Sequence, residues 1–307
     1  MTENNPLISI IIVTYNSAKV IVQCIDSIIK NSGDIKYEIL VVDNGSTDDT
    51  NQLIDKTYGS IVRLFSGHGN IGFAGGNNLG MNKAKGKYFF LINPDTIMHI
   101  HCLQSLVKYA TKNPLTGIIA PKLLNTDGST QHSTFKFPNI TQAFYGFFEK
   151  LTHINSTQNG RYSLLDYDKE RDVEHILGAA MFVQKSFWED VGGMDVNYKL
   201  YFEETDWCYK AHKNNWTLRY IPSAILTHIG AHSTKASPIT NSITYAQSQA
   251  KFYKKHYGSF TYILLKAITI LGVNYWLMRS SYSLIKGKIT FTIYKKLIIS
   301  YVQIIIA

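Results

Sequence analysis

Cysteine is scarce in this sequence, and acidic residues are missing from its last third. The three cysteines, Cys24, Cys102 and Cys208, are far apart and form no C-x-x-C pair. They imply neither a disulfide framework nor a thiolate zinc site, and they fit a reducing, cytoplasmic compartment. The start of the chain, "MTENNP", is polar, so we expect no signal peptide there.

No Asp or Glu follows Asp206. All 22 acidic residues lie at or before Asp206, whereas 13 of the 31 Lys and Arg residues come after it. The basic tail interleaves its charges with long apolar runs, which argues against a nucleic-acid-binding tail and favours the face of a membrane. We expect residues 259–307 to lie on or re-enter the membrane as amphipathic helices. The basic residues expected to meet anionic headgroups are Lys266, Arg279, Lys286, Lys288, Lys295 and Lys296. A true span, a pair of core helices or an oligomer interface are the alternatives.

Strand and helix patterns alternate through the first 95 residues. Continuous apolar runs predict strands buried on both faces. The predicted strands cover residues 7–16, 37–46, 60–66 and 87–95, and the predicted helices cover 17–32, 46–58 and a segment entered through the loop 69–86. Ser17 and Ser46 are expected to cap the first two helices. This order predicts an open, mostly parallel α/β sheet, whose ligands bind at the carboxyl ends of its strands.

Three side chains that could bind a ligand, Tyr15, Asp43 and Asp95, lie at predicted strand ends. Tyr15 and Asp43 could hold a pyrimidine by stacking and by accepting its imide N–H, although Asp-Asn-Gly-Ser is also a common turn sequence. Asp95, in "NPD", could bind Mg²⁺ or Mn²⁺, or cap the next helix. The Gly-rich stretch 70–80 does not fit G-x-G-x-x-G, which disfavours a nicotinamide cofactor. Its helix N-terminus could still meet a diphosphate.

The stretch "YFEETDWC" (201–208) places Glu203, Glu204 and Asp206 among three aromatic residues. Acidic residues favour the first turn of a helix, and we expect a helix to begin near Asp206. Three carboxylates in four positions beside aromatic rings exceed what a helix cap requires. The stretch is therefore a candidate catalytic site.

These motifs occur in one order with "GAAMFVQKSFWEDVGGMDVNY" (178–198) and "ILTHIGAHS" (225–233). Over roughly residues 7–235 the chain resembles the family 2 inverting glycosyltransferases, which have the nucleotide-sugar-binding GT-A fold. Within that family it looks most like the bacterial rhamnosyltransferases of O-antigen and capsule assembly. The resemblance implies a GT-A domain over 1–235, divided at about residue 98 into nucleotide and acceptor halves, and a basic helical tail over 236–307.

The resemblance also assigns roles to the acidic stretch. Glu204 would be the catalytic base, with Glu where Asp is commoner, and Glu203 and Asp206 would support it or contact acceptor hydroxyls. The aromatic segment 131–151 would belong to the acceptor side, or would be an amphipathic helix packed on the sheet.

The implied metal and nucleotide sites draw on the strand ends. The family's D-x-D motif falls on "NPD", so Asp95 would bind Mg²⁺ or Mn²⁺ together with His228, with His232 as the alternative ligand. The residues expected at the nucleotide sugar are Tyr15, Asp43, Asn44, Asn70, Gly72, Asn77 and Asn93.

The implied reaction transfers a sugar from a nucleotide-sugar donor, with inversion, onto a growing glycan. We expect dTDP-L-rhamnose as donor, a lipid-linked acceptor at the inner face of the cell membrane, and no nucleic acid partner. A UDP-sugar donor is the alternative. A glycosidase would also use two carboxylates but would not need nucleotide-binding strand ends. A non-catalytic membrane scaffold would explain the tail but leave those strand ends without a role.

Overall fold

The computed structural model describes residues 5–152, 160–230 and 238–306. The chain forms two compact units. The first comprises residues 1–137, 162–199 and 203–233, and the second comprises 138–161, 200–202 and 234–307. The domain boundary expected at about residue 235 stays a prediction, and a helix from the middle of the chain groups with the C-terminal helices.

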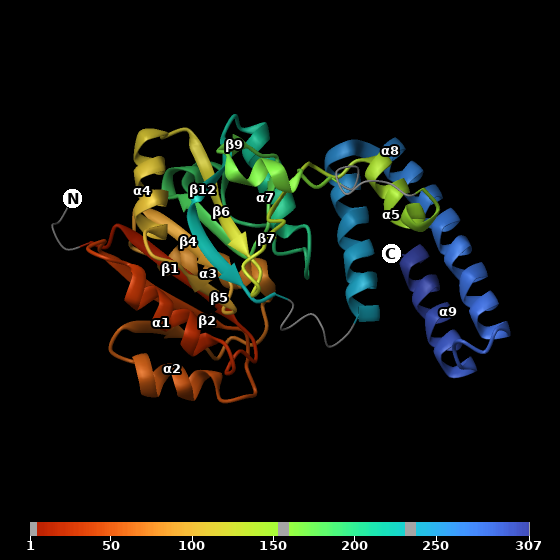
Figure 1. Ribbon diagram of the computed structural model, residues 1–307, viewed down its shortest axis with the longest axis horizontal. Helices are drawn as coiled ribbons and strands as arrows, with labels where there is room; N and C mark the ends of the chain where they lie inside the picture. The colour runs from red at the N-terminus through yellow and green to blue at the C-terminus, as the bar shows by residue number, and fades with distance from the viewer. Residues whose placement is uncertain (1–4, 153–159, 231–237, 307) are drawn as a thin grey trace. The chain divides into compact units, whose positions relative to one another are not determined.

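A mostly parallel sheet forms the centre of the first unit (Figure 1). In spatial order its strands are β3 (Val62–Phe65), β2 (Tyr37–Asp43), β1 (Ile8–Thr14), β4 (Tyr88–Ile92), β11 (Ala180–Gln184), β6 (Thr116–Leu124), β12 (Thr217–His228) and β5 (Thr96–Met98). Only β11 and β5 run antiparallel to their neighbours along this path. The carboxyl ends of the parallel strands therefore share one edge of the sheet.

Short strands complete the first unit. β7 (Thr130–Gln131) pairs with β6, and β9 (Arg171–Asp172) pairs with β12. β8 (Thr134–Phe135) and β10 (His175–Ile176) form a separate two-stranded sheet. A 3₁₀ helix, η2, covers Leu164–Asp168.

Helices cover both faces of the large sheet. They are α1 (Ile21–Asn31), α2 (Thr50–Tyr58), α3 (Gly72–Lys83), α4 (Cys102–Lys112), α6 (Lys185–Val191) and α7 (Glu203–Lys213). Because side chains alternate along a strand, Ile10 and Ile12 of β1 join the core beneath α1, α2 and α4, whereas Ile11 joins the core beneath α3, α6 and α7. Both faces of the central strands are thus buried, as their continuous apolar runs predict.

The glycines of α3 allow this helix to approach β1 closely. A Cβ at Gly76 would stand 2.7 Å from Cγ1 of Val13, and one at Gly80 would overlap Ile11. Asn77 is buried in the same helix, and its amide nitrogen donates to a backbone carbonyl one turn earlier, 3.0 Å away. The stretch expected to be a ligand loop is therefore already helical from Gly72 onward, and part of its glycine content serves packing.

Three expected helix starts are wrong. α1 begins at Ile21, after a turn in which the Ser17 carbonyl accepts its N–H. α2 begins at Thr50 without a side-chain cap, because the Ser46 hydroxyl donates to Asp43 instead. α7 begins at Glu203, three residues before the expected start. The two preceding residues have φ of +67° and +68°, a left-handed conformation that a right-handed helix cannot include.

The second unit is helical and contains α5 (Ile140–Thr152), α8 (Pro238–Ile285) and α9 (Phe291–Ile306). α8 breaks at Gly258, where φ is +81°, and α5 and α9 both pack against it. The segment 131–151 thus contains a helix, as one alternative expected, but this helix packs on α8 within the second unit. By length and composition, one helix among the described residues, spanning Thr240–Ile285, could cross a membrane.

Candidate functional site

The residues predicted at strand ends lie along the carboxyl edge of the parallel strands. Tyr15 follows β1, Asp43 ends β2, Asp95 follows β4 and His228 ends β12. The N-terminus of α3 and the start of the antiparallel strand β11 reach the same edge. The topology therefore gathers residues that are more than 200 positions apart in the sequence.

Asp43 organises the turn after β2. One of its carboxylate oxygens accepts hydrogen bonds from the hydroxyls of Thr14 and Ser46. The other accepts from the N–H groups of Gly45 and Ser46 and from the amide of Asn51, at 3.0–3.2 Å. Burial raises the pKa of Asp43, but these hydrogen bonds outweigh burial and leave the pKa below its usual value. The carboxylate is thus held ionised with both oxygens engaged by the protein.

The turn after β2 is tied to the start of α3. The amide nitrogen of Asn44 donates to the Gly72 carbonyl at 3.0 Å, and the Gly72 N–H donates to the side chain of Asn70 at 3.0 Å. Gly72 has a φ of +75°, which favours glycine. Tyr15 follows the neighbouring strand β1, in which Thr14 pairs with Asp43, and 46% of its surface is exposed, so its ring is available to a ligand. Four of the expected nucleotide-site residues therefore frame one end of this edge.

Asp95 and His228 face each other. Oδ1 of Asp95 lies 3.4 Å from Nε2 of His228, and both side chains are buried. Burial raises the pKa of Asp95, but the interaction with His228 outweighs it, so the pKa lies below the usual range. Nδ1 of His228 lies 2.7 Å from Oε1 of Gln131. The alternative ligand, His232, lies outside the described residues.

The "NPD" turn connects to the acidic stretch through β11. The N–H of Asn93 donates to the Ala179 carbonyl at 3.0 Å. At the adjacent Gly178, a Cβ would lie 3.1 Å from the ring of Phe73 and 3.8 Å from Cγ of Glu204. The first turn of α3, the start of β11 and the first turn of α7 therefore meet here. Glu204 belongs to the same edge as the strand-end residues.

The two neighbouring glutamates have different surroundings. Glu203 is only 3% exposed, and burial together with the adjacent Glu204 raises its pKa to about 9. The side chain of Glu204 is 13% exposed, and its Oε1 lies 3.9 Å from Nε2 of His175. The same histidine nitrogen lies 3.0 Å from the hydroxyl of Thr205. Glu203 is thus a protonated, enclosed carboxyl near neutral pH, and Glu204 is the more accessible of the two.

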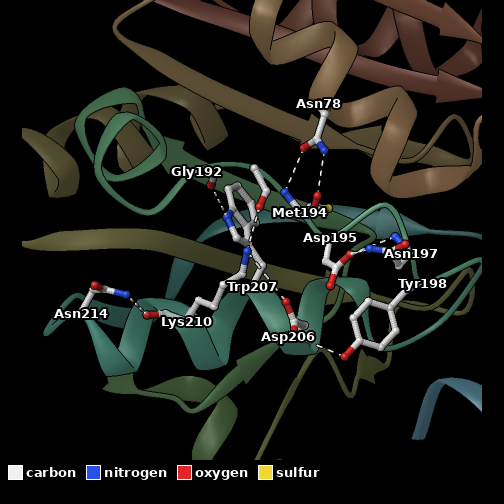
Figure 2. A network of polar contacts seen from close by, with 11 residues as sticks. Asn78, Gly192, Met194, Asp195, Asn197, Tyr198, Asp206, Trp207, Lys210 and Asn214 are labelled. Atoms are coloured by element: carbon white, nitrogen blue, oxygen red, sulfur yellow. Dashed lines mark hydrogen bonds and ion pairs between the residues drawn. The ribbon is translucent and has the colours of Figure 1, made fainter. Parts of the chain in front are cut away.

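Asp206 joins α7 to the loop that precedes it (Figure 2). Its Oδ1 accepts a hydrogen bond from the hydroxyl of Tyr198 at 3.2 Å, and its Oδ2 lies 3.9 Å from Nζ of Lys210. Trp207 donates from its indole N–H to the Gly192 carbonyl at 2.8 Å. Asp206 is fully buried, and these contacts hold its carboxylate between the loop and the helix.

Sequence reasoning missed three side chains that hold this site together. Asn78 of α3 bonds both backbone polar groups of Met194, at 2.8 and 2.9 Å (Figure 2). His175 contacts the start of α7, and Gln131 contacts His228. Their partners are 30 to 116 positions away, so no local pattern marks these contacts.

The protein offers few ligands for a cation. Within the part of the chain that the structure describes, no group of three or more His, Cys, Asp or Glu side chains could hold a metal ion. Asp95 and His228 would therefore supply two donors, and further ligands would come from substrate or water, as Mg²⁺ commonly requires.

Comparison with known proteins places the chain in a family. The model described as glycosyl transferase family 2 matches residues 9–183, which is more than half of the chain. The chain belongs to glycosyl transferase family 2. The expected family is thereby confirmed.

Two curated relatives of this glycosyltransferase are informative. The N-acetylglucosaminyl-diphospho-decaprenol L-rhamnosyltransferase of Mycobacterium tuberculosis is 29% identical over 219 residues, which cover 66% of this chain and 70% of the relative. The low-salt glycan biosynthesis hexosyltransferase Agl10 of Haloferax volcanii is 27% identical over 212 residues, covering 68% of this chain and 62% of the relative.

Solved structures show the fold. GalNAc-T7, solved with UDP, GalNAc and Mn²⁺, aligns with a TM-score of 0.56 and 16% identity, over 74% of this glycosyltransferase and 44% of that chain. Residues 1–349 of S. aureus TarS align with a TM-score of 0.53 and 17% identity, over 97% of this chain and 80% of that one. The expected GT-A fold, followed by long C-terminal helices, is confirmed.

Proposed function

We propose that this glycosyltransferase moves L-rhamnose from dTDP-L-rhamnose, with inversion, onto a lipid-linked glycan. The geometry that supports the proposal is the assembly of Asp95, His228 and Glu204 along one edge of the sheet. The donor and acceptor classes are supported by the similarity to the mycobacterial N-acetylglucosaminyl-diphospho-decaprenol L-rhamnosyltransferase. A UDP-sugar is the second candidate donor, because TarS and GalNAc-T7 were both solved with UDP.

The nucleotide end of the donor would bind beside β1 and β2. The exposed ring of Tyr15 offers a stacking surface for the base. Because the oxygens of Asp43 are engaged within its turn, its main contribution would be to hold that turn in place. Asn44, Asn70 and Gly72 would position the sugar-phosphate portion near the N-terminus of α3, whose dipole favours a diphosphate. Asn93 would approach the donor from the other side, while the buried Asn77 would act through helix packing.

The Asp95–His228 pair fits a divalent cation. A carboxylate and an imidazole are both donors for Mn²⁺, and their facing atoms are 3.4 Å apart. Neighbouring ligands around an octahedral ion of this size lie about 3 Å apart. When bound, Mg²⁺ or Mn²⁺ would stabilise the negative charge that grows on the leaving diphosphate. Asp95 holds that position from the turn after β4, and His228 holds it from the end of β12.

Glu204 would act as general base. It would accept the proton of the acceptor hydroxyl as that oxygen attacks the anomeric carbon on the face opposite the diphosphate. Of the two neighbouring glutamates, Glu204 is the more accessible, whereas Glu203 is enclosed and protonated near neutral pH. His175 contacts both Glu204 and the hydroxyl of Thr205 in the first turn of α7, and would restrict the orientation of Glu204. Asp206 would support the loop before the helix.

The second unit would bring the enzyme to the inner face of the cell membrane. After the break at Gly258, α8 and α9 expose large apolar side chains, including Phe260, Ile263, Leu271, Met278, Ile285, Phe291, Ile293, Ile299, Val302 and Ile306. Exposed basic residues accompany them, at Arg279, Lys286, Lys288, Lys295 and Lys296. Lys266, expected from the sequence to meet lipid headgroups, instead donates to the Ile305 carbonyl near the C-terminal end of α9, at 2.5 Å. That contact ties the two helices together.

A donor panel tests the proposed reaction. Purified full-length enzyme would be melted with dTDP-L-rhamnose, UDP-sugars and GDP-sugars, each with and without Mn²⁺, and the preferred donor would then be tested for transfer to a lipid-linked glycan. We expect the largest Mn²⁺-dependent rise in Tm with dTDP-L-rhamnose, since a ligand that binds the native state stabilises it. A larger rise with a UDP-sugar would favour the second candidate, and a preference for GDP-sugars would contradict both.

A further inference from the structure

Gln131 reaches the histidine of the proposed metal pair from another strand. Its Oε1 lies 2.7 Å from Nδ1 of His228, across 97 positions of sequence. β7 is paired with β6 so that Gln131 lies opposite Leu123, and β6 in turn pairs with β12, the strand that ends at His228. The position of Gln131 is therefore set by the sheet register.

The orientation of the Gln131 amide is fixed by its nitrogen. Nε2 of Gln131 lies 2.9 Å from Oδ1 of Asn125 and 3.4 Å from the carbonyl of His228, and a carbonyl can only accept. Asn125 is held in turn, because its own amide nitrogen donates to the hydroxyl of Ser129 at 2.9 Å. With the amide nitrogen committed to acceptors, the oxygen of Gln131 must be the atom that faces His228. The partner nitrogen, Nδ1, must then carry a hydrogen.

We infer that Gln131 is the positioning residue of the cation site: it keeps a hydrogen on Nδ1 of His228 and so leaves Nε2, which faces Asp95, as the metal-binding nitrogen. This inference rests on the proposed metal pair. Histidines that bind metals generally donate their other ring N–H to an oxygen acceptor, which fixes the ring and its tautomer. In place of Gln131, an apolar residue would let the hydrogen move to Nε2, where the carboxylate of Asp95 can accept it. A cation would then have to displace that hydrogen before it could bind Nε2.

Three full-length variants separate this role from a structural one. Gln131→Leu keeps the approximate volume but removes the acceptor, whereas Gln131→Glu keeps an oxygen acceptor for Nδ1–H. Gln52→Leu, at an exposed position on α2, is the matched control. Each variant would first be melted to confirm that it folds. Mn²⁺ binding would then be measured by calorimetry in the presence of a nucleoside diphosphate.

We expect Gln131→Leu to weaken Mn²⁺ binding by about 10–100-fold, the usual effect of losing such a supporting contact. Gln131→Glu and Gln52→Leu should bind Mn²⁺ close to the wild-type affinity. Spectra of ¹⁵N-histidine-labelled protein give a second readout, which needs no metal. At mildly alkaline pH the wild type should carry hydrogen on Nδ1 of His228, with the signal identified by its loss in His228→Gln. Gln131→Leu should shift that hydrogen to Nε2.

The two readouts distinguish the possible failures. Wild-type Mn²⁺ affinity in Gln131→Leu, or a bare Nδ1 in the wild-type spectrum, would overturn the role of Gln131 while leaving the metal pair in place. Unchanged Mn²⁺ binding in both Asp95→Asn and His228→Gln would overturn the metal pair itself, and the inference with it.

Discussion

Asn78 holds both backbone polar groups of Met194: its amide nitrogen lies 2.8 Å from the Met194 carbonyl, and its amide oxygen lies 2.9 Å from the Met194 N–H. The two residues are 116 positions apart, and the contact joins α3 to the loop that leads into α7. α3 begins at the proposed donor site, and the first turn of α7 carries the proposed base, Glu204. One side chain thus links the donor side of the site to its catalytic side.

We expect Asn78→Ala to lower the free energy of unfolding by about 1–3 kcal/mol, because it leaves the N–H and the carbonyl of Met194 without their partner. Urea unfolding measures this loss. Asn82→Ala, at an exposed position on the same helix, should change stability by less than about 0.5 kcal/mol. Equal losses in the two variants would show that the contact to Met194 contributes nothing specific.

Asp95→Asn should abolish Mn²⁺-dependent stabilisation by donor and nearly abolish transfer. The amide keeps the shape of the side chain but removes the charge that would hold the cation opposite His228. The comparison is Asp55→Asn, an exposed acid on α2, which should behave as wild type. Full transfer activity in EDTA, together with an active Asp95→Asn variant, would show that the pair is only an ion pair within the fold.

Glu204→Gln should reduce transfer by about 10²–10⁴-fold, the usual contribution of a general base, while donor binding measured by calorimetry survives. Glu203→Gln should be milder, because Glu203 is enclosed and its carboxyl is protonated near neutral pH. If Glu203→Gln were inactive and Glu204→Gln transferred sugar at the wild-type rate, the base would be Glu203.

The raised pKa of Glu203 makes stability depend on pH. Burial and the neighbouring Glu204 hold the folded pKa at about 9, against 4.5 for an ordinary glutamate. Between these values the folded state binds more protons than the unfolded state, so stability falls as pH rises, by at most about 1.4 kcal/mol per pH unit from this group. Melting curves from pH 5 to 9 should therefore fall less steeply in Glu203→Gln than in wild type. Parallel curves for the two proteins would contradict the shift.

The sequence predicted those features that rest on local patterns. Continuous apolar runs located β1, β2 and β4, and the chain order of these strands placed Tyr15, Asp43 and Asp95 at one edge. The helix starts after β1 and β2 were mispredicted because Ser17 and Ser46, which look like caps, make their contacts within the turns that frame the site. Local preference was overridden there by contacts between neighbouring strand ends.

The contacts that hold the site together could not be predicted from local patterns. Gln131 and Asn78 are ordinary amides in sequence, and only the folded sheet reveals that they meet His228 and Met194. The burial of Glu203 could not be predicted for the same reason. The sequence shows three neighbouring acidic residues, but it does not show which of their side chains the fold encloses.

Membrane attachment of the second unit should depend on four exposed lysines, Lys286, Lys288, Lys295 and Lys296. Reversing all four to Glu should weaken binding to vesicles that contain anionic lipid by at least about 4 kcal/mol, since each basic residue near such a surface contributes about 1 kcal/mol. Sedimentation with anionic and with neutral vesicles measures the change.

The matched control reverses four exposed lysines of the first unit, Lys56, Lys85, Lys108 and Lys112, and alters net charge by the same amount. Attachment that both sets abolish equally would exclude a specific lipid-facing role for these four lysines. Retention of the first variant on neutral and anionic vesicles alike would show that the exposed apolar side chains alone suffice for anchoring.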